Sequence, residues 1–369
     1  MFRSNPVIDR FIKIFFLPAC YYKIRKNKQC KKSAFTLASD LLELFFSYKT
    51  FPDNYNACRL WNVSKSNWKY YYGSNYQSYQ KEKFQKIMPN EYRILFYDKV
   101  VCDRLCSATG VRLPCTYGVI SPEQNYIEKI ISWFSTHSKD ILIVKPIRGS
   151  AGKNIILLKK VKDKIIVQSD TKLIPLQEFV LPGPAVVQEY IKQDKRMNVI
   201  SRHSLNTLRI VTMLTRDESV IILAAYMRCG VGESYRDNVS TGGLGICVNR
   251  ETGQLNKYAI DSGGKRYIEH PTSKAIFGDF VVPEWQMIME AAKKTQRVFS
   301  FYPMLGLDLG LQENGEPVLI EVNAVPDLLH AETICEPLLK DKRIIKAFGE
   351  YNLLINKHQK ELYENLLNE

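Results

Sequence analysis

Two carboxylates and an asparagine in the C-terminal third of the chain have the spacing of a metal site. Two apolar runs flank Asn314 and Gly315, a dipeptide typical of a two-residue β-hairpin turn. With a turn of that length, Asp308 lies directly across from Glu321, and Asn323 follows on the same face of the strand pair. The pattern therefore predicts three oxygen ligands on one face of a hairpin.

Carboxylates that face each other across a strand pair repel unless a cation lies between them. In the same register Gly306 sits opposite Asn323 and leaves room there. Oxygen ligands of this kind suit Mg²⁺. The alternative is that Asp308 and Glu321 are ordinary solvent-facing strand residues, which their Leu, Ile and Val neighbours argue against. A turn of more than two residues would shift the register and weaken the prediction.

A lysine and a glycine-bearing loop could meet the phosphates of a nucleotide. Lys145 ends an apolar strand and shares a face with Ile141 and Ile143, so its ammonium group emerges beside the loop. Glycine lets the backbone approach phosphate oxygens, and basic or hydroxyl side chains add donors. The loop lacks the P-loop spacing, and an ordinary surface turn is the alternative. Its candidate phosphate contacts are Arg148, Gly149, Ser150, Gly152 and Lys153.

Three charged residues lie inside apolar strands and need partners. Glu189 lies in VVQEYI, where a ligand or a structural Lys or Arg would satisfy it. Arg209 in TLRIVTML and Arg228 at the end of AAYMR each need an anionic partner. A salt bridge within the protein could satisfy either arginine, so the strands alone do not decide between structure and catalysis.

The loop after the second arginine has a backbone able to wrap a carbonyl or phosphoryl oxygen, through Asn238, Gly242 and Gly243. Other catalytic templates are missing from the sequence. It contains no GxSxG elbow and no HExxH motif, and the five histidines are scattered without ligand spacing. These absences argue against a hydrolase or a zinc enzyme.

Alternating strands and one amphipathic helix must position these residues. Apolar runs bounded by turn residues predict the strands, and apolar spacing typical of a core-facing helix predicts the helix. The expected strands cover 141–145, 155–158, 164–167, 186–191, 207–215, 220–227, 243–249 and 255–259, and the helix covers 284–299.

In order, the motifs resemble those of the ATP-grasp superfamily. They are VKPIRGSAGKN, VVQEYI, NTLRIVT, RDNVSTGG and GLDLG with LIEVNAVP, and they cover roughly residues 95–335. RHSLNTLRIVT with DNVSTGGLG most resembles the sugar-transfer-associated ATP-grasp proteins of surface-polysaccharide biosynthesis, and more distantly the glutamate ligases. The resemblance implies an α+β ATP-grasp fold, in which two α+β subdomains sandwich ATP, with an extra helical N-terminal region.

The resemblance also implies how ATP is bound. Lys145 contacts the α-phosphate, and residues 148–153 close over the β- and γ-phosphates. Gln188, Glu189 and Ile191 belong to the hinge that holds adenine, with Glu189 near the base.

By the same resemblance, Arg209 and Arg228 neutralise the transferring phosphoryl group and the acyl phosphate. The second lysine usual on the strand before the hinge is not identifiable, and Lys153 and Lys159 are the candidates. The residues that match the metal positions, for two Mg²⁺ ions, are Asp308, Glu321 and Asn323. The residues that line the reaction centre are Asn238, Gly242 and Gly243.

The implied activity is ATP-dependent carboxylate–amine ligation through an acyl phosphate, with ADP and phosphate as products. The substrates are a small-molecule carboxylate and an amine, and the surface-polysaccharide context suggests an amino acid joined to a sugar acid or nucleotide sugar. Two alternatives remain: a phosphotransferase on the same fold, and a non-catalytic nucleotide-binding scaffold at the periphery of a membrane.

Five regions are expected along the chain. Residues 1–90 form a basic, aromatic helical region without an assigned chemical role, and 91–140 form connecting helices. Residues 141–195 form the small ATP-grasp subdomain with the glycine loop, and 196–345 form the large subdomain with the metal site. Residues 346–369 form a C-terminal helix.

Composition narrows the partners and the compartment. The 369 residues include 52 Lys and Arg against 38 Asp and Glu, a formal net charge of +14 that favours anionic partners. No nucleic-acid recognition motif accompanies the basic residues, so nucleic acid is not expected as a partner. The nine cysteines show no CxxC pair, which predicts reduced thiols in the cytoplasm.

The first residues form an amphipathic segment. Val7, Ile8, Phe11, Ile12, Phe15 and Phe16 recur at helical spacing, and a run of lysines and arginines follows up to residue 32. The favoured interpretation is a helix packed on the body of the protein, followed by a solvated basic tail. The alternative is peripheral contact of residues 7–32 with the inner face of a membrane.

Overall fold

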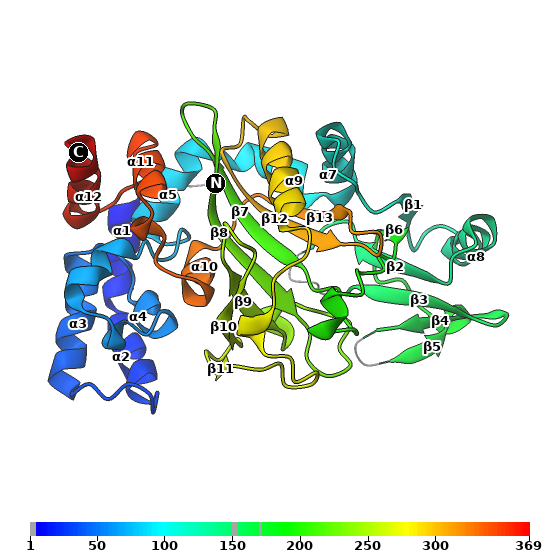
Figure 1. Ribbon diagram of the computed structural model, residues 1–369, viewed down its shortest axis with the longest axis horizontal. Helices are drawn as coiled ribbons and strands as arrows, with labels where there is room; N and C mark the ends of the chain where they lie inside the picture. Colours follow the sequence, from blue (N-terminus) through cyan, green and yellow to red (C-terminus); the bar gives the residue numbers. More distant parts are fainter. Residues whose placement is uncertain (1–4, 150–153, 170–171) are drawn as a thin grey trace.

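The computed structural model describes residues 5–149, 154–169 and 172–369, which form two antiparallel β-sheets with helices around them (Figure 1). The start and the end of the chain together form a helical region beside the larger sheet (Figure 1). The fold is therefore of the expected α+β class, with an additional N-terminal helical region.

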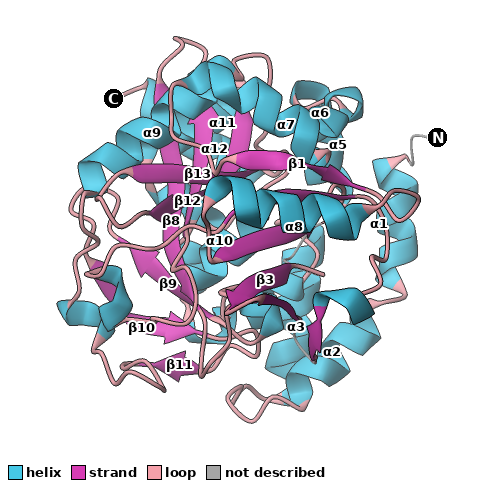
Figure 2. Cartoon of the chain, turned by 90° about the vertical axis from the view of Figure 1, so that its right-hand side faces the viewer, coloured by secondary structure: helices cyan, strands magenta, loops and turns pink. Residues whose placement is uncertain are grey.

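The smaller sheet has six strands in the order β1-β6-β2-β3-β4-β5. Helix α8 (Tyr126–His137) lies across its outer face (Figure 2), where Ile130 and Phe134 enter a separate core. Because side chains alternate along a strand, Lys145 on β2 points to the opposite face. Strand β1 and helix α8 fall within residues 91–140, the region expected to hold connecting helices, with a short extended segment after Pro114. The strands are β1 (Thr116–Ile120), β2 (Ile141–Pro146), β3 (Ile156–Val161), β4 (Lys164–Gln168), β5 (Leu173–Pro175) and β6 (Ala185–Glu189).

The larger sheet has seven strands in the order β11-β10-β9-β8-β7-β12-β13. Helix α9 (Trp285–Val298) covers one face and buries Ile288 and Ala292 in the main core. The strands and the helix expected over residues 141–299 are confirmed, with small differences at their ends. The strands are β7 (Leu208–Leu214), β8 (Val220–Cys229), β9 (Leu244–Val248), β10 (Leu255–Ile260), β11 (Arg266–Tyr267), β12 (Met304–Leu311) and β13 (Pro317–Asn323).

The turn of the β12–β13 hairpin is longer than the two residues expected. The N–H of Gln312 donates to the carbonyl of Glu316 at 3.1 Å, and the N–H of Gly315 donates to the Gln312 carbonyl at 2.8 Å. Gly315 has a φ of +81°, the left-handed conformation that ends a three-residue hairpin loop. Pairing next to the turn is therefore shifted by one residue from the prediction.

A β-bulge at Ile320 cancels this shift. Leu309 pairs with Leu319, whereas Asp308 pairs with Glu321, so Ile320 has no partner on β12. The predicted pairing of Asp308 with Glu321 is confirmed, although the prediction assumed a regular hairpin with a shorter turn.

Helices from both ends of the chain form the remaining region. Buried residues between Ile24 and Trp68 form a separate core, whereas the later helices of this region pack against the main core. Two helices occupy the end of the chain, where a single one was expected over 346–369. The helices are α1 (Pro6–Ile14), α2 (Leu17–Arg25), α3 (Ala34–Phe46), α4 (Asp53–Ala57), α5 (Ser78–Ile87), α6 (Ile94–Tyr97), α7 (Lys99–Cys106), α10 (Leu328–Ile334), α11 (Lys342–Glu350) and α12 (Lys357–Leu367).

Helix α1 packs on the protein, as the favoured interpretation expects, but its polar side makes the contact. Its one buried residue is Arg10, whereas Phe11 is 64% exposed and Phe15, at its C-terminal end, is 73% exposed. The apolar face that the helical spacing identifies therefore lies in solvent. Within the described part of the chain, no helix combines the length and the apolar character needed to cross a membrane.

Two cysteines are paired, so the expectation of reduced thiols throughout is wrong for them. Cys247 on β9 and Cys335 at the end of α10 form a disulfide, with their Cα atoms 4.8 Å apart. They are 88 residues apart in sequence, a separation at which sequence spacing gives no signal. The other seven cysteines are free thiols.

A buried carboxylate joins the N-terminal region to α10. Glu332 accepts hydrogen bonds from the backbone N–H groups of Tyr72, Gly73 and Leu338 at 2.8, 2.9 and 3.1 Å. Burial raises the pKa of Glu332 to about 7, against the opposing effect of these donors. The contact therefore fixes the N-terminal region against the side of the larger sheet.

We expect Glu332→Leu to lower the free energy of unfolding by roughly 3 kcal/mol or more, because three buried N–H groups lose their acceptor. Urea denaturation followed by tryptophan fluorescence measures the change. The exposed neighbour Glu336, changed to Leu, is the matched control and should leave the midpoint almost unchanged. Equal midpoints for both variants would contradict the role assigned to Glu332.

Candidate active site

A pocket lies where the inner face of the smaller sheet meets strands β7, β8, β12 and β13 of the larger sheet. Ten of the site residues predicted from the sequence line it, and they come from both sheets. They are Lys145, Gly149, Glu189, Ile191, Arg209, Arg228, Asn238, Asp308, Glu321 and Asn323.

Asp308 is the centre of the charged wall of the pocket. It is 2% exposed and lies directly opposite Arg209 on β7. Nε and Nη2 of Arg209 donate to its two carboxylate oxygens at 2.5 and 3.0 Å, and Nη2 of Arg228 lies 3.1 Å from Oδ2. Both arginines thus have the anionic partner that their apolar strands require.

The three charges hold one another ionised. Burial favours the neutral acid, but Arg209 and Arg228 keep the pKa of Asp308 below its ordinary value. Burial also disfavours the charged guanidinium groups, yet Asp308 raises the pKa of Arg209 and of Arg228 above their ordinary values. The cluster therefore stays charged over the whole range in which proteins function.

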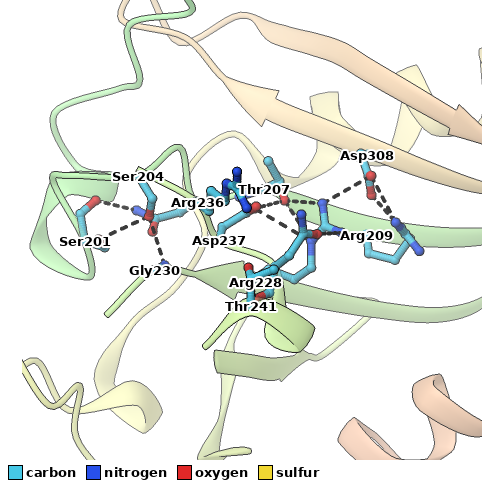
Figure 3. A network of polar contacts seen from close by, with 12 residues as sticks. Ser201, Ser204, Thr207, Arg209, Arg228, Gly230, Arg236, Asp237, Thr241 and Asp308 are labelled. Carbon is cyan, nitrogen blue, oxygen red and sulfur yellow. Dashed lines mark hydrogen bonds and ion pairs between the residues drawn. The ribbon is translucent and has the colours of Figure 1, made fainter. Parts of the chain in front are cut away.

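Two residues that the sequence analysis did not single out position Arg228 (Figure 3). Nε and Nη2 of Arg228 donate to the hydroxyl of Thr207 at 3.0 and 2.7 Å. The Thr207 hydroxyl donates in turn to the carboxylate of Asp237. Nη1 of Arg228 donates to the amide oxygen of Asn238 at 3.0 Å. The only sequence signal for Thr207 and Asp237 was their place within two motifs, NTLRIVT and RDNVSTGG.

The bulge in β13 turns two neighbouring side chains toward the same pocket. Adjacent residues of a regular strand point to opposite faces, but Ile320 and Glu321 both line the pocket. The Glu321 carboxylate is one-third exposed, and among the described residues its one ion-pair neighbour is Lys99, at 3.8 Å. The apolar side chain of Ile320 and the carboxylate of Glu321 thus both face the pocket.

The side-chain oxygens of Asp308, Glu321 and Asn323 are of the chemical type that binds Mg²⁺. Asp308 faces Glu321 across the strands, and Asn323 lies opposite Gly306, where a Cβ would come within 3.1 Å of Pro326. The Asn323 amide nitrogen donates to the Gly306 carbonyl and to Asp308 at 3.3 and 3.5 Å, which leaves its oxygen for another partner. Two carboxylates and an amide oxygen are the ligands that Mg²⁺ prefers.

Lys145 is a buried cation whose ammonium group has no protein partner among the described residues. It is 7% exposed, and no hydrogen bond or ion pair of its ammonium group is found within residues 5–149, 154–169 and 172–369. Burial lowers its pKa, and the nearby Glu321 offsets the effect only in part. A buried ammonium group in a pocket calls for an anionic ligand.

A second lysine, missed by the sequence analysis, lines the same pocket. Lys99 is the first residue of α7, and its ammonium group donates to the Gly149 carbonyl at 3.2 Å. The candidates named from the sequence are not found there: Lys159 does not line the pocket, and Lys153 lies outside the described residues. Helix α7 is far from the expected strand in sequence, so spacing gave no signal.

The hinge residues differ in what their side chains contact. Ile191 and Glu189 line the pocket, but Gln188 does not: its Nε2 donates to Asp103 and Thr116 at 3.0 Å each. Gln188 pairs with Ile143 and so lies on the inner face of the smaller sheet, and its part in holding adenine stays a prediction.

Glu189 is paired as the structural alternative anticipated. Its carboxylate lies 2.5 Å from Nη2 of Arg112 and 3.3 Å from Nζ of Lys139. Burial opposes ionisation, yet these partners hold the pKa of Glu189 below its ordinary value. The residue therefore fixes the pocket wall through an ion-pair network.

Three of the remaining predicted loop residues, Arg148, Gly242 and Gly243, are described and do not line the pocket. The Arg148 side chain is largely exposed and pairs with Asp98 at 3.4 Å. Gly242 has a φ of +99°, and a Cβ on Gly243 would collide with the Asp237 carbonyl, so both glycines shape the loop that carries Asp237 and not the pocket wall. Ser150, Gly152 and Lys153 lie outside the described residues.

Apolar side chains form the rest of the pocket. They come from β2, β3, the segment after β6 and β13, and they face the charged wall. They include Ile143, Leu157, Ile191 and Ile320. A ligand with a flat apolar part and a highly anionic part would match both walls.

One curated protein is similar to about half of the chain. The chain is 27% identical over 205 residues to a probable alpha-tubulin polyglutamylase, Ttll1, of Tetrahymena thermophila, and this match covers 50% of the chain and 48% of that protein. The chain thus spans about half the length of this curated relative.

Two of the solved structures that the chain resembles are a ligase and a synthetase. The VanG D-Ala:D-Ser ligase of Enterococcus faecalis has a TM-score of 0.40 and 15% identity, over 69% of this chain and 61% of that chain. D-cycloserine synthetase DcsG has a TM-score of 0.38 and 14% identity, over 76% and 73%. These scores are too low to assign the family. The model of the sugar-transfer associated ATP-grasp family, however, matches residues 79–345, and the chain therefore belongs to that family.

Proposed function

We propose that the protein is an ATP-dependent ligase that activates a substrate carboxylate as an acyl phosphate and transfers the acyl group to an amine. The observation that carries the proposal is the pocket itself. It joins a buried lysine and an apolar wall to two arginines and a set of Mg²⁺-type oxygen ligands. Family membership supports ATP as the molecule that fits this combination.

In this proposal the two walls bind different parts of ATP. The apolar wall holds the adenine, next to Ile320, and the ammonium groups of Lys145 and Lys99 hold phosphate oxygens. Mg²⁺ held by Asp308, Glu321 and Asn323 would neutralise phosphate charge. The protein's own contribution is to fix these groups before the reaction begins, which lowers the cost of orienting them.

The arginines serve the reacting groups. A carboxylate oxygen of the substrate attacks the γ-phosphorus of ATP. The bond between the γ-phosphorus and the oxygen that bridges it to the β-phosphate breaks, so ADP leaves and an acyl phosphate forms. The amine then attacks the acyl carbon, and phosphate leaves with the electron pair of the broken C–O bond. Arg228, held by Thr207 and Asn238, stabilises the negative oxygens of both steps, with Arg209 on its other side.

The substrates we propose are an amino acid and a sugar acid or nucleotide sugar, in surface-polysaccharide biosynthesis. The family description, sugar-transfer associated, supports the sugar component. The name of the Tetrahymena relative, a probable polyglutamylase, supports the amino acid. We propose that the enzyme works in the cytoplasm, at the inner face of a membrane, where residues 7–32 make peripheral contact.

A crossed panel of amino acids and sugar acids tests the ligase directly. With ATP and Mg²⁺ present, we expect ADP release that requires both substrates and a product whose mass equals their sum less one water. A phosphorylated acceptor without an amide would instead identify a phosphotransferase. ATP binding without turnover on the whole panel would support a non-catalytic scaffold and overturn the ligase proposal.

Changing Glu321 to Gln should lower kcat by about 100-fold or more, because one of the charged oxygen ligands at the transferring phosphate is lost. The matched control is Glu316→Gln, on the same strand pair but exposed at the turn. ADP release and thermal unfolding are measured for both. Full Mg²⁺-dependent turnover by the Glu321 variant would refute its role as a metal ligand.

Changing Thr207 to Val should lower kcat by roughly tenfold or more and leave the KM for ATP almost unchanged, because Arg228 loses the hydroxyl that positions it. Thr207→Ser keeps the hydroxyl and should retain most of the activity. A merely structural role would reduce the thermal midpoint of the valine variant without this split between kcat and KM. An unchanged kcat would contradict the assignment.

A further inference from the structure

Helix α1 is packed with its polar side toward the protein. The side chain of Arg10 lies 3.9 Å from the ring centre of Phe45 and donates to the Lys49 carbonyl at 3.2 Å. Asp9 accepts from the Ser78 hydroxyl at 2.6 Å, and Lys13 donates to Gln77 at 2.5 Å. The charged and polar residues of the helix are therefore used for docking on α3 and α5.

This packing leaves the apolar face of α1 in solvent. A surface helix of a globular protein normally does the reverse, with its apolar stripe toward the core. At 100° per residue the exposed apolar side chains fall within less than half of the helix circumference. They define the apolar face of α1: Val7, Ile8, Phe11, Ile12 and Phe15, each more than half exposed. Phe16, which follows, is also more than half exposed.

Basic residues follow this face in the chain. The α2 helix and the connection to α3 carry the basic segment, which consists of Lys23, Arg25, Lys26, Lys28, Lys31 and Lys32. Within it the ammonium group of Lys26 lies 4.3 Å from the ring centre of the exposed Tyr22. Phe35, 85% exposed, follows the segment at the start of α3. Apolar and aromatic side chains next to Lys and Arg are the composition of helices that lie in a membrane interface.

We propose that the apolar face of α1 enters the interface of an anionic lipid bilayer and that the basic segment binds its headgroups. This proposal rests on the inner-membrane location proposed above and names the surface and the lipid chemistry that hold the enzyme there. Figure 2 shows α1 at an outer edge of the molecule, where a flat surface can reach it.

Charge favours lipid over a second copy of the chain as the occupant. The chain has a formal net charge of +14, and the basic segment directly follows α1 in the sequence. Two copies paired through this face would bring like charges together. An anionic bilayer offers apolar depth and negative charge at once, and it attracts basic residues within a Debye length of its surface.

Vesicle co-sedimentation tests the proposal on the full-length protein. Vesicles of phosphatidylcholine with about one-third phosphatidylglycerol should bind the protein, and pure phosphatidylcholine vesicles should bind it much less. We expect the double variant Phe11→Ser, Phe15→Ser to lower the partition coefficient on anionic vesicles by at least about tenfold. Lys28→Gln with Lys31→Gln should reduce the preference for anionic over neutral vesicles.

The matched control removes two other exposed apolar side chains, Leu173→Ser and Val180→Ser, which are 69% and 80% exposed on the smaller sheet and its edge. This variant should bind vesicles like the parent. ATP turnover without vesicles should stay unchanged in the phenylalanine variant, which separates failure of the docking from failure of the ligase proposal.

Two outcomes would overturn the proposal. The first is equal vesicle binding by the parent and the phenylalanine variant, or no binding by either. The second is a dimer of the parent in light scattering that the phenylalanine changes convert to monomer while vesicle binding is absent. That result would make a second copy of the chain the partner of the apolar face.

Discussion

The site depends on one buried carboxylate that holds two arginines from neighbouring strands. Asp308 lies opposite Arg209 on β7 and also reaches Arg228 on β8. Buried charges are tolerated only when geometry and hydrogen bonds repay their desolvation. The pairing of β8, β7 and β12 is therefore tied to the position of these charges, and the charges in turn define one wall of the pocket. The sheet and the site are specified by the same contacts.

The hairpin of β12 and β13 links the two halves of the pocket. Its bulge allows Ile320 to lie against the apolar wall while its neighbour Glu321 joins the carboxylate opposite. A regular hairpin would turn one of them to the other face. The irregularity thus brings an apolar contact and an oxygen ligand within one residue of each other, as bulges beside functional sites do.

The N-terminal helical region supports the site as well as carrying the exposed helix. Asn75 donates to the Pro326 carbonyl at 3.0 Å and accepts from the Leu328 N–H at 3.1 Å, and the Tyr76 hydroxyl donates to the Val325 carbonyl at 2.7 Å. These contacts fix the loop that directly follows Asn323. A region that lies largely before the family match is therefore in direct contact with the loop beside the predicted metal site.

The sequence by itself determined the strands that carry the site, because alternation on a strand fixes which side chains share a face. Motif order predicted that Lys145 and the two arginines belong to one site. The pairing of Asp308 with Glu321 was predicted from a two-residue turn, and it is found because the longer turn and the bulge at Ile320 offset each other. Only the tertiary structure showed Lys99, Thr207 and Asp237, because their partners are distant in the chain. It also decided that Asp103 and Thr116 take up the Gln188 side chain, and that α1 turns its apolar face outward. Periodicity identifies an amphipathic face, but which side is buried depends on the partner it meets.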